Sequence, residues 1–247
     1  MTEPSICATV ADYGLLADRC SEALVSHDGS VDWLCLPRYD SPPVFGRVLD
    51  RGGGHWSIRP AGRFKTERRH LPGTLVLETT FVTSRGVVRL TDAMPFANDA
   101  YGNGSGAASR HELMRSVAGL SGEVRLVMEL TPHADDPDRI AIRVGVPVRV
   151  DGSTLRAAFT VSAGSRVGFS LCWSGAGGRR EPTPPERVAA QIEHTVWRSW
   201  VEGHEVAAST HGRLAALSAH LRERRAAEPS SASGPVDSSP GLALLAR

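Results

Sequence analysis

Apolar and polar residues alternate along much of this chain, with the period of two that a half-buried antiparallel strand requires. The clearest case is the segment 123–130. Its apolar positions are Val124, Leu126, Met128 and Leu130, and its polar positions include Glu123, Arg125 and Glu129. This alternation predicts a strand with one face on a hydrophobic core and the other in water.

Other short apolar runs are separated by turn residues. Two of them flank an Asp28-Gly29 pair, which favours a hairpin because glycine accepts the positive φ of a tight turn. The runs that we expect to be strands are residues 23–25, 31–36, 74–82, 87–91, 140–150, 155–161 and 167–173. Many short strands without intervening helices predict a mainly β protein, an antiparallel β-sandwich.

The pattern becomes helical after residue 175. Val188, Ile192, Val196 and Trp200 recur every four residues, which predicts a helix with one apolar stripe. A second, weaker helix is expected near residues 214–221. Either the first helix folds back on the sandwich, or its tryptophans, Trp197 and Trp200, contact another domain or chain.

We therefore expect four regions along the chain. They are a β-sandwich at residues 1–175, a Gly/Pro/Arg-rich linker at 176–185, a helical segment at 186–225 and a tail at 226–247. The tail is rich in Ser, Pro, Ala and Gly, so we expect it to be disordered. The polar, Gly-rich residues 98–109 are expected to form a surface loop.

Composition narrows the class of protein. A hydrophobic content of 41% supports a real core, and a net charge of +1 gives no overall attraction to nucleic acid or an anionic membrane. No early apolar segment has the length of a signal peptide or membrane span, so we expect a cytoplasmic location. The four cysteines lack CxxC spacing, which favours reduced thiols over a zinc site. No motif indicates a metal or cofactor.

Several separated motifs resemble, in the same order, the start of bacterial glycoside hydrolase family 15 proteins, the trehalase and glucoamylase-like group. The main motif is DGSVDWLCLPRYDSP at residues 28–42. The others are ADYGLLAD at 11–18, LPGTLVLET at 71–79, VRLTDAMP at 88–95, RSVAGLSGEV at 115–124 and, more weakly, WRSW at 197–200. The resemblance covers roughly residues 6–200.

The resemblance implies an N-terminal β-sandwich of supersandwich type, followed in the family by a catalytic α/α barrel. From residue 201 onward the chain does not resemble the first barrel helices. We hypothesise that the gene is truncated or changes reading frame near that point, with a genuine stand-alone domain as the alternative. The implied partner is an α/α-barrel catalytic domain acting in trans, or a second copy of the chain.

The most interesting local cluster is Trp33, Arg38, Tyr39 and Asp40. Aromatic faces can stack on a sugar ring, and an arginine with an aspartate can bracket its hydroxyls, so the cluster suggests an α-glucoside ligand. Alternatively, Trp33 belongs to the core and Arg38 pairs with Asp40 in a loop that borders the barrel's substrate entrance. We favour this second interpretation, because aromatic residues on strands mostly serve packing.

Glycoside hydrolysis needs two carboxyl groups beside the scissile bond. The acids here, which include Asp12, Asp18, Asp28, Asp32, Asp40, Glu78 and Asp92, lie in no motif that the family uses for catalysis. We expect Asp28 and Asp32 to bond nearby backbone amides instead. The basic clusters at 68–70 and 222–225 are expected on solvated helix or loop faces.

Three functions remain open at this point. The favoured one is a non-catalytic domain that stabilises and borders a catalytic barrel acting on trehalose or α-glucans, with no catalytic residue of its own. The second is a stand-alone carbohydrate-binding module that uses Trp33 and Tyr39. The third is an active hydrolase with a relocated site.

Overall fold

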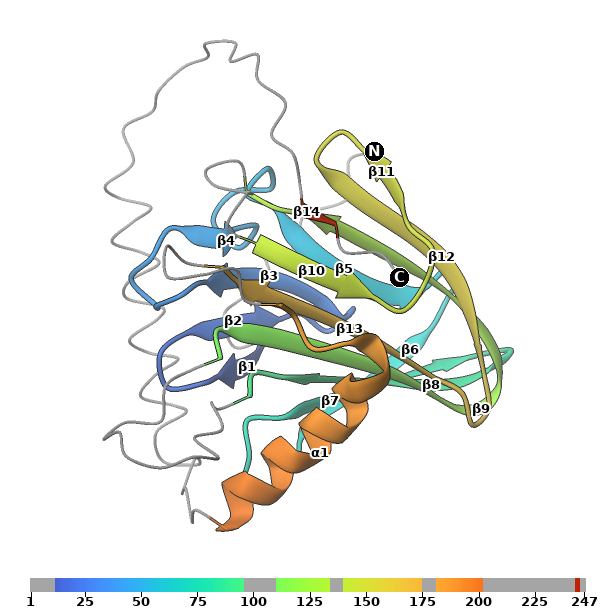
Figure 1. Cartoon of the computed structure of the whole chain (residues 1–247). Helices are drawn as coiled ribbons and strands as arrows, with labels where there is room; N and C mark the ends of the chain where they lie inside the picture. Colours follow the sequence, from blue (N-terminus) through green and yellow to red (C-terminus); the bar gives the residue numbers. More distant parts are fainter. Residues whose placement is uncertain (1–11, 96–109, 134–139, 175–180, 202–242, 245–247) are drawn as a thin grey trace.

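The computed structural model describes residues 12–95, 110–133, 140–174, 181–201 and 243–244. These residues form fourteen strands and one helix (Figure 1). The strands are β1 (Gly14–Ala17), β2 (Glu22–Val25), β3 (Ser30–Cys35), β4 (Pro43–Phe45), β5 (His55–Pro60), β6 (Lys65–His70), β7 (Leu77–Thr83), β8 (Gly86–Ala93), β9 (Glu112–Thr131), β10 (Ile140–Val144), β11 (Arg149–Asp151), β12 (Thr154–Ser162), β13 (Arg166–Trp173) and β14 (Ala243–Leu244). The helix, α1, spans Pro185–Val201.

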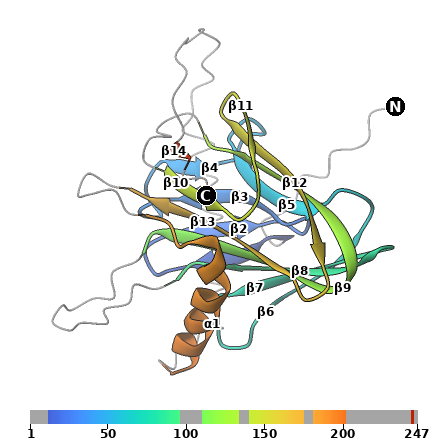
Figure 2. The ribbon, with the colours of Figure 1, turned by 45° about the vertical axis from the view of Figure 1, so that its right-hand side comes forward.

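The strands form two layers that share one long strand, β9 (Figures 1 and 2). The first layer has the order β1-β2-β3-β5-β9-β12-β11, with β4 on β3. The second has the order β6-β7-β8-β9-β13-β10-β14. All pairs are antiparallel except β10 with β14. The predicted mainly β, antiparallel sandwich is confirmed.

One large hydrophobic core fills the space between the layers. It takes Val124, Leu126, Met128 and Leu130 from β9, as the alternation of segment 123–130 predicted. A smaller cluster, which includes Leu15, Leu24, Trp33 and Cys35, lies among β1, β2 and β3. Cys20, Cys35 and Cys172 are free thiols, and Cys7 lies outside the described residues.

Strand β9 changes its inward face between its two halves. In the first half Leu113 and Val117 face the main core, whereas in the second half Val124 and Leu126 do so. The pairing with β8 shows the cause, because Val87 pairs with Ser121 but Val88 pairs with Gly119, so Leu120 is an extra residue. A bulge of one residue exchanges the two faces of a strand.

The bulge lets Arg115, in the first half of β9, point into the protein. Its guanidinium donates to both carboxylate oxygens of Asp92, at 2.8 and 3.2 Å. It also donates to the carbonyls of Trp56 at 2.7 Å and Gly29 at 2.8 Å, and it lies 5.2 Å from the centre of the Trp56 ring. Burial raises the pKa of the Asp92 carboxyl, and the arginine opposes that rise. We call these four residues the buried clamp.

Gly29 in the clamp requires its glycine backbone. Its φ is +79°, and a Cβ there would lie 2.6 Å from the carbonyl oxygen of Ile58. The predicted hairpin between β2 and β3 is therefore present, with glycine at the turn position that needs a positive φ. Three motifs of the family resemblance thus meet in the clamp, through Gly29, Asp92 and Arg115.

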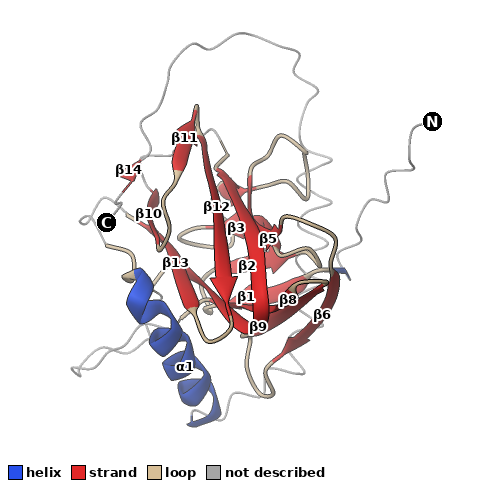
Figure 3. Ribbon diagram, turned by 90° about the vertical axis from the view of Figure 1, so that its right-hand side faces the viewer, coloured by secondary structure: helices blue, strands red, loops and turns tan. Residues whose placement is uncertain are grey.

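Helix α1 packs on the outer face of the second layer, alongside β13 (Figures 2 and 3). Its apolar stripe of Val188, Ile192 and Val196 is buried against a group that includes Met114 of β9. Glu112 accepts a hydrogen bond from the backbone amide of Thr183 at 2.6 Å, which fastens the segment before the helix to β9. The helix therefore folds back on the sandwich through the predicted stripe.

Some expectations about elements were wrong. Residues 68–70 are not on a helix or loop but in strand β6, where the Arg68 guanidinium donates to the carbonyls of Val25 and Asp12. The run 140–150 is two strands, β10 and β11, and strands β1, β4, β5 and β6 were not predicted. The expected loop at 98–109 and the second helix lie outside the described residues. In the tail, Ala243 and Leu244 pair with β10, and the rest lies outside them.

Candidate functional site

The loop between β3 and β4 presents three of the four residues of the predicted cluster to solvent. Arg38 Nε donates to Asp40 Oδ1 at 3.0 Å, and both side chains are mostly exposed. Tyr39 is 54% exposed, with the Arg38 guanidinium 5.9 Å from its ring centre. Its backbone amide donates to the carbonyl of Cys20 at 2.9 Å, which ties the loop to the β1–β2 turn. The loop offers an exposed aromatic ring beside an ion pair.

The structure separates Trp33 from that loop. Trp33 is only 1% exposed and packs in the small cluster of β1, β2 and β3. A sugar ring has no access to a tryptophan face buried in this way. The residues suggested by sequence for sugar binding therefore do not converge on one surface.

Two acids of the main motif, Asp28 and Asp32, are held by side chains, not by the backbone amides that we expected. Asp32, in the middle of β3, accepts hydrogen bonds from Tyr13 Oη at 3.0 Å and Ser30 Oγ at 2.6 Å, and its carboxylate lies 2.7 Å from Arg47. Burial, followed by the nearby Asp32, raises the pKa of the Tyr13 phenol. Asp28 accepts from Ser26 Oγ and, at 3.1 Å, from Arg59. Both acids stabilise the hairpin region.

Other buried acids are also engaged in holding strands together. Glu78 lies 2.8 Å from Arg69 and 3.2 Å from Arg89, and so links β6, β7 and β8. Glu112 lies 3.1 Å from Arg110 and binds the Thr183 amide. Asp92 belongs to the buried clamp. These carboxylates are used for structure, and none of them lines the hollow over strands β5, β9 and β12.

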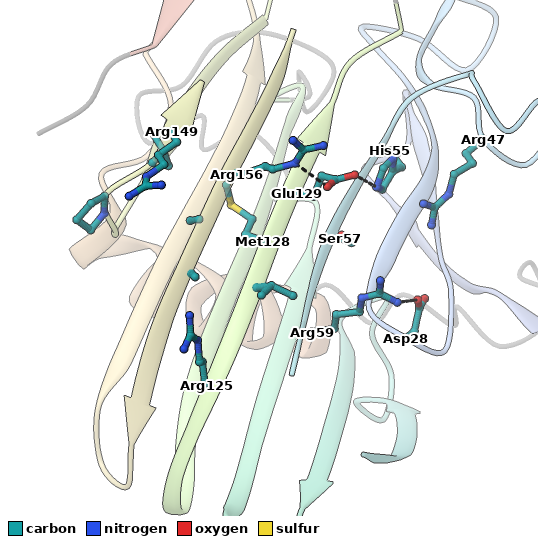
Figure 4. A pocket seen from close by; sticks show the side chains of 15 residues that line it. Asp28, Arg47, His55, Ser57, Arg59, Arg125, Met128, Glu129, Arg149 and Arg156 are labelled. Carbon is teal, nitrogen blue, oxygen red and sulfur yellow. Dashed lines mark hydrogen bonds and ion pairs between the residues drawn. The ribbon is translucent and has the colours of Figure 1, made fainter. Parts of the chain in front are cut away.

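That hollow, with a volume of about 920 Å³, is the feature that sequence reasoning missed. It lies on the outer face of the first layer, over β5, the second half of β9, and β12, beside the segment that precedes β11 (Figure 4). Its charged lining residues are Asp28, Arg47, Arg59, Arg125, Glu129, Arg149 and Arg156. We call it the arginine hollow. No sequence signal marks it, because these residues are spread from position 28 to position 156.

Three of the five arginines bind carboxylates. Arg59 lies 3.1 Å from Asp28, and Arg47 lies 2.7 Å from Asp32, which is just behind the lining. Arg156 lies 3.0 Å from Glu129 and 2.6 Å from Asp151. Figure 4 shows the pairs Arg59–Asp28 and Arg156–Glu129, each between neighbouring parts of the lining.

The other two arginines, Arg125 and Arg149, have no carboxylate partner among the described residues and point toward the solvent side of the sheet (Figure 4). His55 completes this edge, 3.5 Å from Glu129. Burial, and then the charge of Arg47, lower the pKa of the His55 imidazole below its ordinary value. The hollow therefore carries an excess of positive charge.

The arginine hollow is poorly equipped for glycoside hydrolysis. Its two lining carboxylates, Asp28 and Glu129, are both engaged by arginines, whereas a hydrolase needs one to donate a proton and the other to act as base or nucleophile. No Phe, Tyr or Trp side chain is among its described lining residues. In the part of the chain that the structure describes, no cluster of His, Cys, Asp or Glu could hold a metal ion. Nor is any described helix long and apolar enough to cross a membrane.

The predicted inter-domain residues of the helix can be placed only in part. Trp197 is 57% exposed on the side of α1 away from the sheet, and its ring centre lies 5.9 Å from that of His194. The side chain of Trp200 lies outside the described residues. Trp197 is therefore a large apolar surface that the sandwich leaves uncovered.

Comparison with known proteins connects this fold to one family. Residues 6–154 match the family model described as trehalase-like, N-terminal. The chain is 32% identical to a trehalase of Mycolicibacterium smegmatis over 242 aligned residues and 30% identical to a trehalase of Mycobacterium tuberculosis over 233. Each match covers 78% of this chain and 34% of the relative. A third relative, trehalase 1 of Sulfolobus acidocaldarius, is 42% identical over 88 residues, which are 35% of this chain and 15% of the relative.

The chain thus spans about a third of the length of the mycobacterial relatives that it matches. The similarity extends beyond the family model, because 78% of the chain is aligned with each of them. It is a similarity to one portion of these proteins.

Proposed function

Because the chain belongs to the trehalase-like N-terminal family, we propose that it is the non-catalytic β domain of a hydrolase of glycoside hydrolase family 15. The domain stabilises a catalytic α/α barrel and borders its substrate cleft. The reaction of the whole enzyme is hydrolysis of an α-glucosidic bond, in trehalose or an α-glucan. The proposal holds whether the barrel is encoded in the same polypeptide or in another.

One observation carries this proposal: the buried carboxylates of the described strands, and the two that line the arginine hollow, all pair with arginines. Asp92, Glu78 and Glu112 are buried and bound by arginines. Asp28 and Glu129, the acids of the arginine hollow, are bound as well. A general acid and a nucleophile need to face a substrate across a cleft, and these groups do not offer that arrangement.

Two exposed features support a contact with a second domain. Tyr39 and its ion pair project from the β3–β4 loop, and Trp197 projects from α1. Large aromatic side chains left in water are typical of interfaces, where their burial contributes most of the binding free energy. The competing function, a stand-alone carbohydrate-binding module, retains Tyr39 alone, since Trp33 is buried.

The proposal can be tested with a chimera in which this chain replaces the matching third of the Mycolicibacterium smegmatis trehalase. We expect the chimera to hydrolyse trehalose and the isolated chain to release no glucose. Trp197→Ala and Tyr39→Ala should lower the thermal stability of the chimera more than that of the isolated chain. Leu120→Ala, at an exposed leucine of the β9 bulge, is the control and should affect both equally.

Two results would count against the proposal. Turnover of trehalose by the isolated chain would show that it contains a catalytic site. Trehalose or maltooligosaccharide binding to the isolated chain, lost on Tyr39→Ala, would favour the carbohydrate-binding module.

A further inference from the structure

The arginine hollow has a regular floor that follows from strand register. Across β5, β9 and β12, Arg59 lies opposite Val127, and Val127 lies opposite Ala158. The row on one side of this floor holds Ser57, Glu129 and Arg156, with Arg149 next to Arg156 on β11. The row on the other side holds Arg125 opposite Thr160. Side chains two residues apart on one strand are separated by about 7 Å. A long arginine side chain in one row can therefore reach over the neighbouring row.

Small apolar side chains therefore lie at the centre and arginines lie around them. Arg59 stands on the β5 side, Arg149 and Arg156 at one end, and Arg125 at the other (Figure 4). Val127 and Ala158 are too short to fill the space between these guanidinium groups. The structure thus provides an open space above a flat floor, with positive charge on three sides.

The ion pairs of the hollow position its arginines. Asp28 holds Arg59 at 3.1 Å, and Glu129 and Asp151 hold Arg156 at 3.0 and 2.6 Å. A guanidinium has five N–H donors, so one that already binds a carboxylate keeps donors for a second acceptor. Arg125 and Arg149, without a carboxylate partner in the described part of the chain, leave all of their charge for a ligand.

We infer that the arginine hollow binds a small molecule that carries a phosphate or carboxylate group, with the oxyanion above Val127 and Ala158. Arg125 and Arg149 provide its main charge-assisted hydrogen bonds, and Arg59 and Arg156 add further donors. Arginine is suited to this role, because its planar fork matches the oxygens of carboxylate and phosphate groups. This inference is independent of the proposed partnership with a catalytic barrel.

The dimensions of the site favour a small ligand. A volume of about 920 Å³ lies within the range of typical small-molecule sites. A neutral sugar is disfavoured, since the described lining has no Phe, Tyr or Trp side chain on which it could stack. The group of arginines is also small, and Asp28 and Asp151 lie beside it. Their negative charges would repel a long polyanion.

Calorimetric titration of the full chain at low ionic strength tests the inference. The probes are inorganic phosphate, glucose 6-phosphate and citrate, with glucose as the uncharged control. We expect at least one anionic probe to bind, glucose not to bind, and added salt to weaken the binding. Preference for phosphate and glucose 6-phosphate would identify a phosphoryl group, and preference for citrate would identify carboxylates.

Variants locate the site. Arg125→Gln and Arg149→Gln should each weaken binding by about tenfold or more, because each removes a charge-assisted hydrogen bond to the anion. Both arginines are exposed and hold no carboxylate of the described fold, so the unfolding midpoint should not change. The matched control is Arg187→Gln, an exposed arginine on α1, which packs on the other layer.

Three results would overturn the inference. The first is the absence of binding by any of the anionic probes up to about 10 mM. The second is equal weakening in Arg187→Gln, which would indicate a general charge effect. The third is binding of a polyglutamate peptide without binding of the small probes, which would indicate an acidic macromolecule instead.

Discussion

The two halves of strand β9 place the same residue type in opposite surroundings. Arg115, in the first half, is fully buried and donates four hydrogen bonds to Asp92, Trp56 and Gly29. Arg125, in the second half, is exposed at the rim of the arginine hollow. The extra residue Leu120 separates them and exchanges the two faces of the strand.

The outer faces of the two halves differ as well. Helix α1 covers the first half, where Met114 packs against its apolar stripe. No described element covers the second half in the same way, and that face forms the hollow. The difference shows that motif residues of the covered half build the fold, whereas residues of the uncovered half are available for binding. A charged residue in a family motif is therefore no sign of catalysis by itself.

The most drastic way to break this comparison is to delete Leu120. Without the bulge, one half of β9 must turn its apolar face outward or lose its pairing with β8. We expect the deletion to abolish cooperative unfolding by urea, followed by circular dichroism. The substitution Leu120→Ala keeps the residue count and should unfold cooperatively, near the original midpoint. A folded deletion variant would show that the register is not set by the bulge.

Arg115→Met removes the cation of the buried clamp and leaves the Asp92 carboxylate buried without its partner. We expect a loss of about 3–5 kcal/mol in the free energy of unfolding, measured by urea titration. Arg125→Met, on the same strand, should change it by less than about 0.5 kcal/mol. Adding Asp92→Leu to Arg115→Met should recover part of the loss, and equal effects of the two arginine variants would contradict the comparison.

Ile192→Ala tests the cover on the first half of β9. The side chain is buried between α1 and the sheet, so its truncation should cost about 2–4 kcal/mol. Hydrogen exchange should rise first in the amides of α1, while the second half of β9 keeps its protection. A uniform rise throughout β9 would mean that the two halves respond as one unit.

A smaller effect should appear with pH. Burial lowers the pKa of His70 below its ordinary value near 6.5, and the ring lies 2.9 Å from the carbonyl of Leu15. Below pH 6.5 the His70 imidazole takes up a proton more readily in the unfolded chain than in the folded chain. The free energy of unfolding therefore decreases as the pH falls. Urea titrations at pH 7.5 and 5.5 should show this loss, and His70→Gln should reduce it. An undiminished loss in the variant would assign the effect to other groups.

The smallest effect is expected at the exposed loop between β3 and β4. Asp40→Asn removes the ion pair with Arg38, and exposed pairs of this kind contribute little because water screens them. The unfolding midpoint of the isolated chain should not change measurably. A clear shift would show that the loop is part of the folded framework and not a free surface.

Sequence patterns predicted the elements whose apolar residues repeat regularly. Segment 123–130 and the stripe of α1 are examples, since their burial depends on one face of one element. Strand β6 was not predicted because its sequence KTERRH is polar and its backbone pairing, not its hydrophobicity, defines it. The orientation of Arg115 was unpredictable for another reason, because the bulge reverses the alternation within a single strand.

Sequence patterns were equally limited in predicting the candidate sites. The family motifs pointed to residues 28–42, but only the fold shows that Trp33 is buried while Tyr39 is exposed. The arginine hollow depends on the register of β5, β9 and β12, which brings together residues far apart along the chain. Pairing between distant strands is information that one sequence does not reveal.

The most direct test of the central claim, that the described domain is a scaffold without hydrolytic chemistry, is a trehalose hydrolysis assay on the purified chain. Glucose release should not exceed that of a blank prepared in the same way. Release that is abolished by Asp28→Asn or Glu129→Gln, with an unchanged unfolding midpoint, would contradict the claim and place a catalytic site in the arginine hollow.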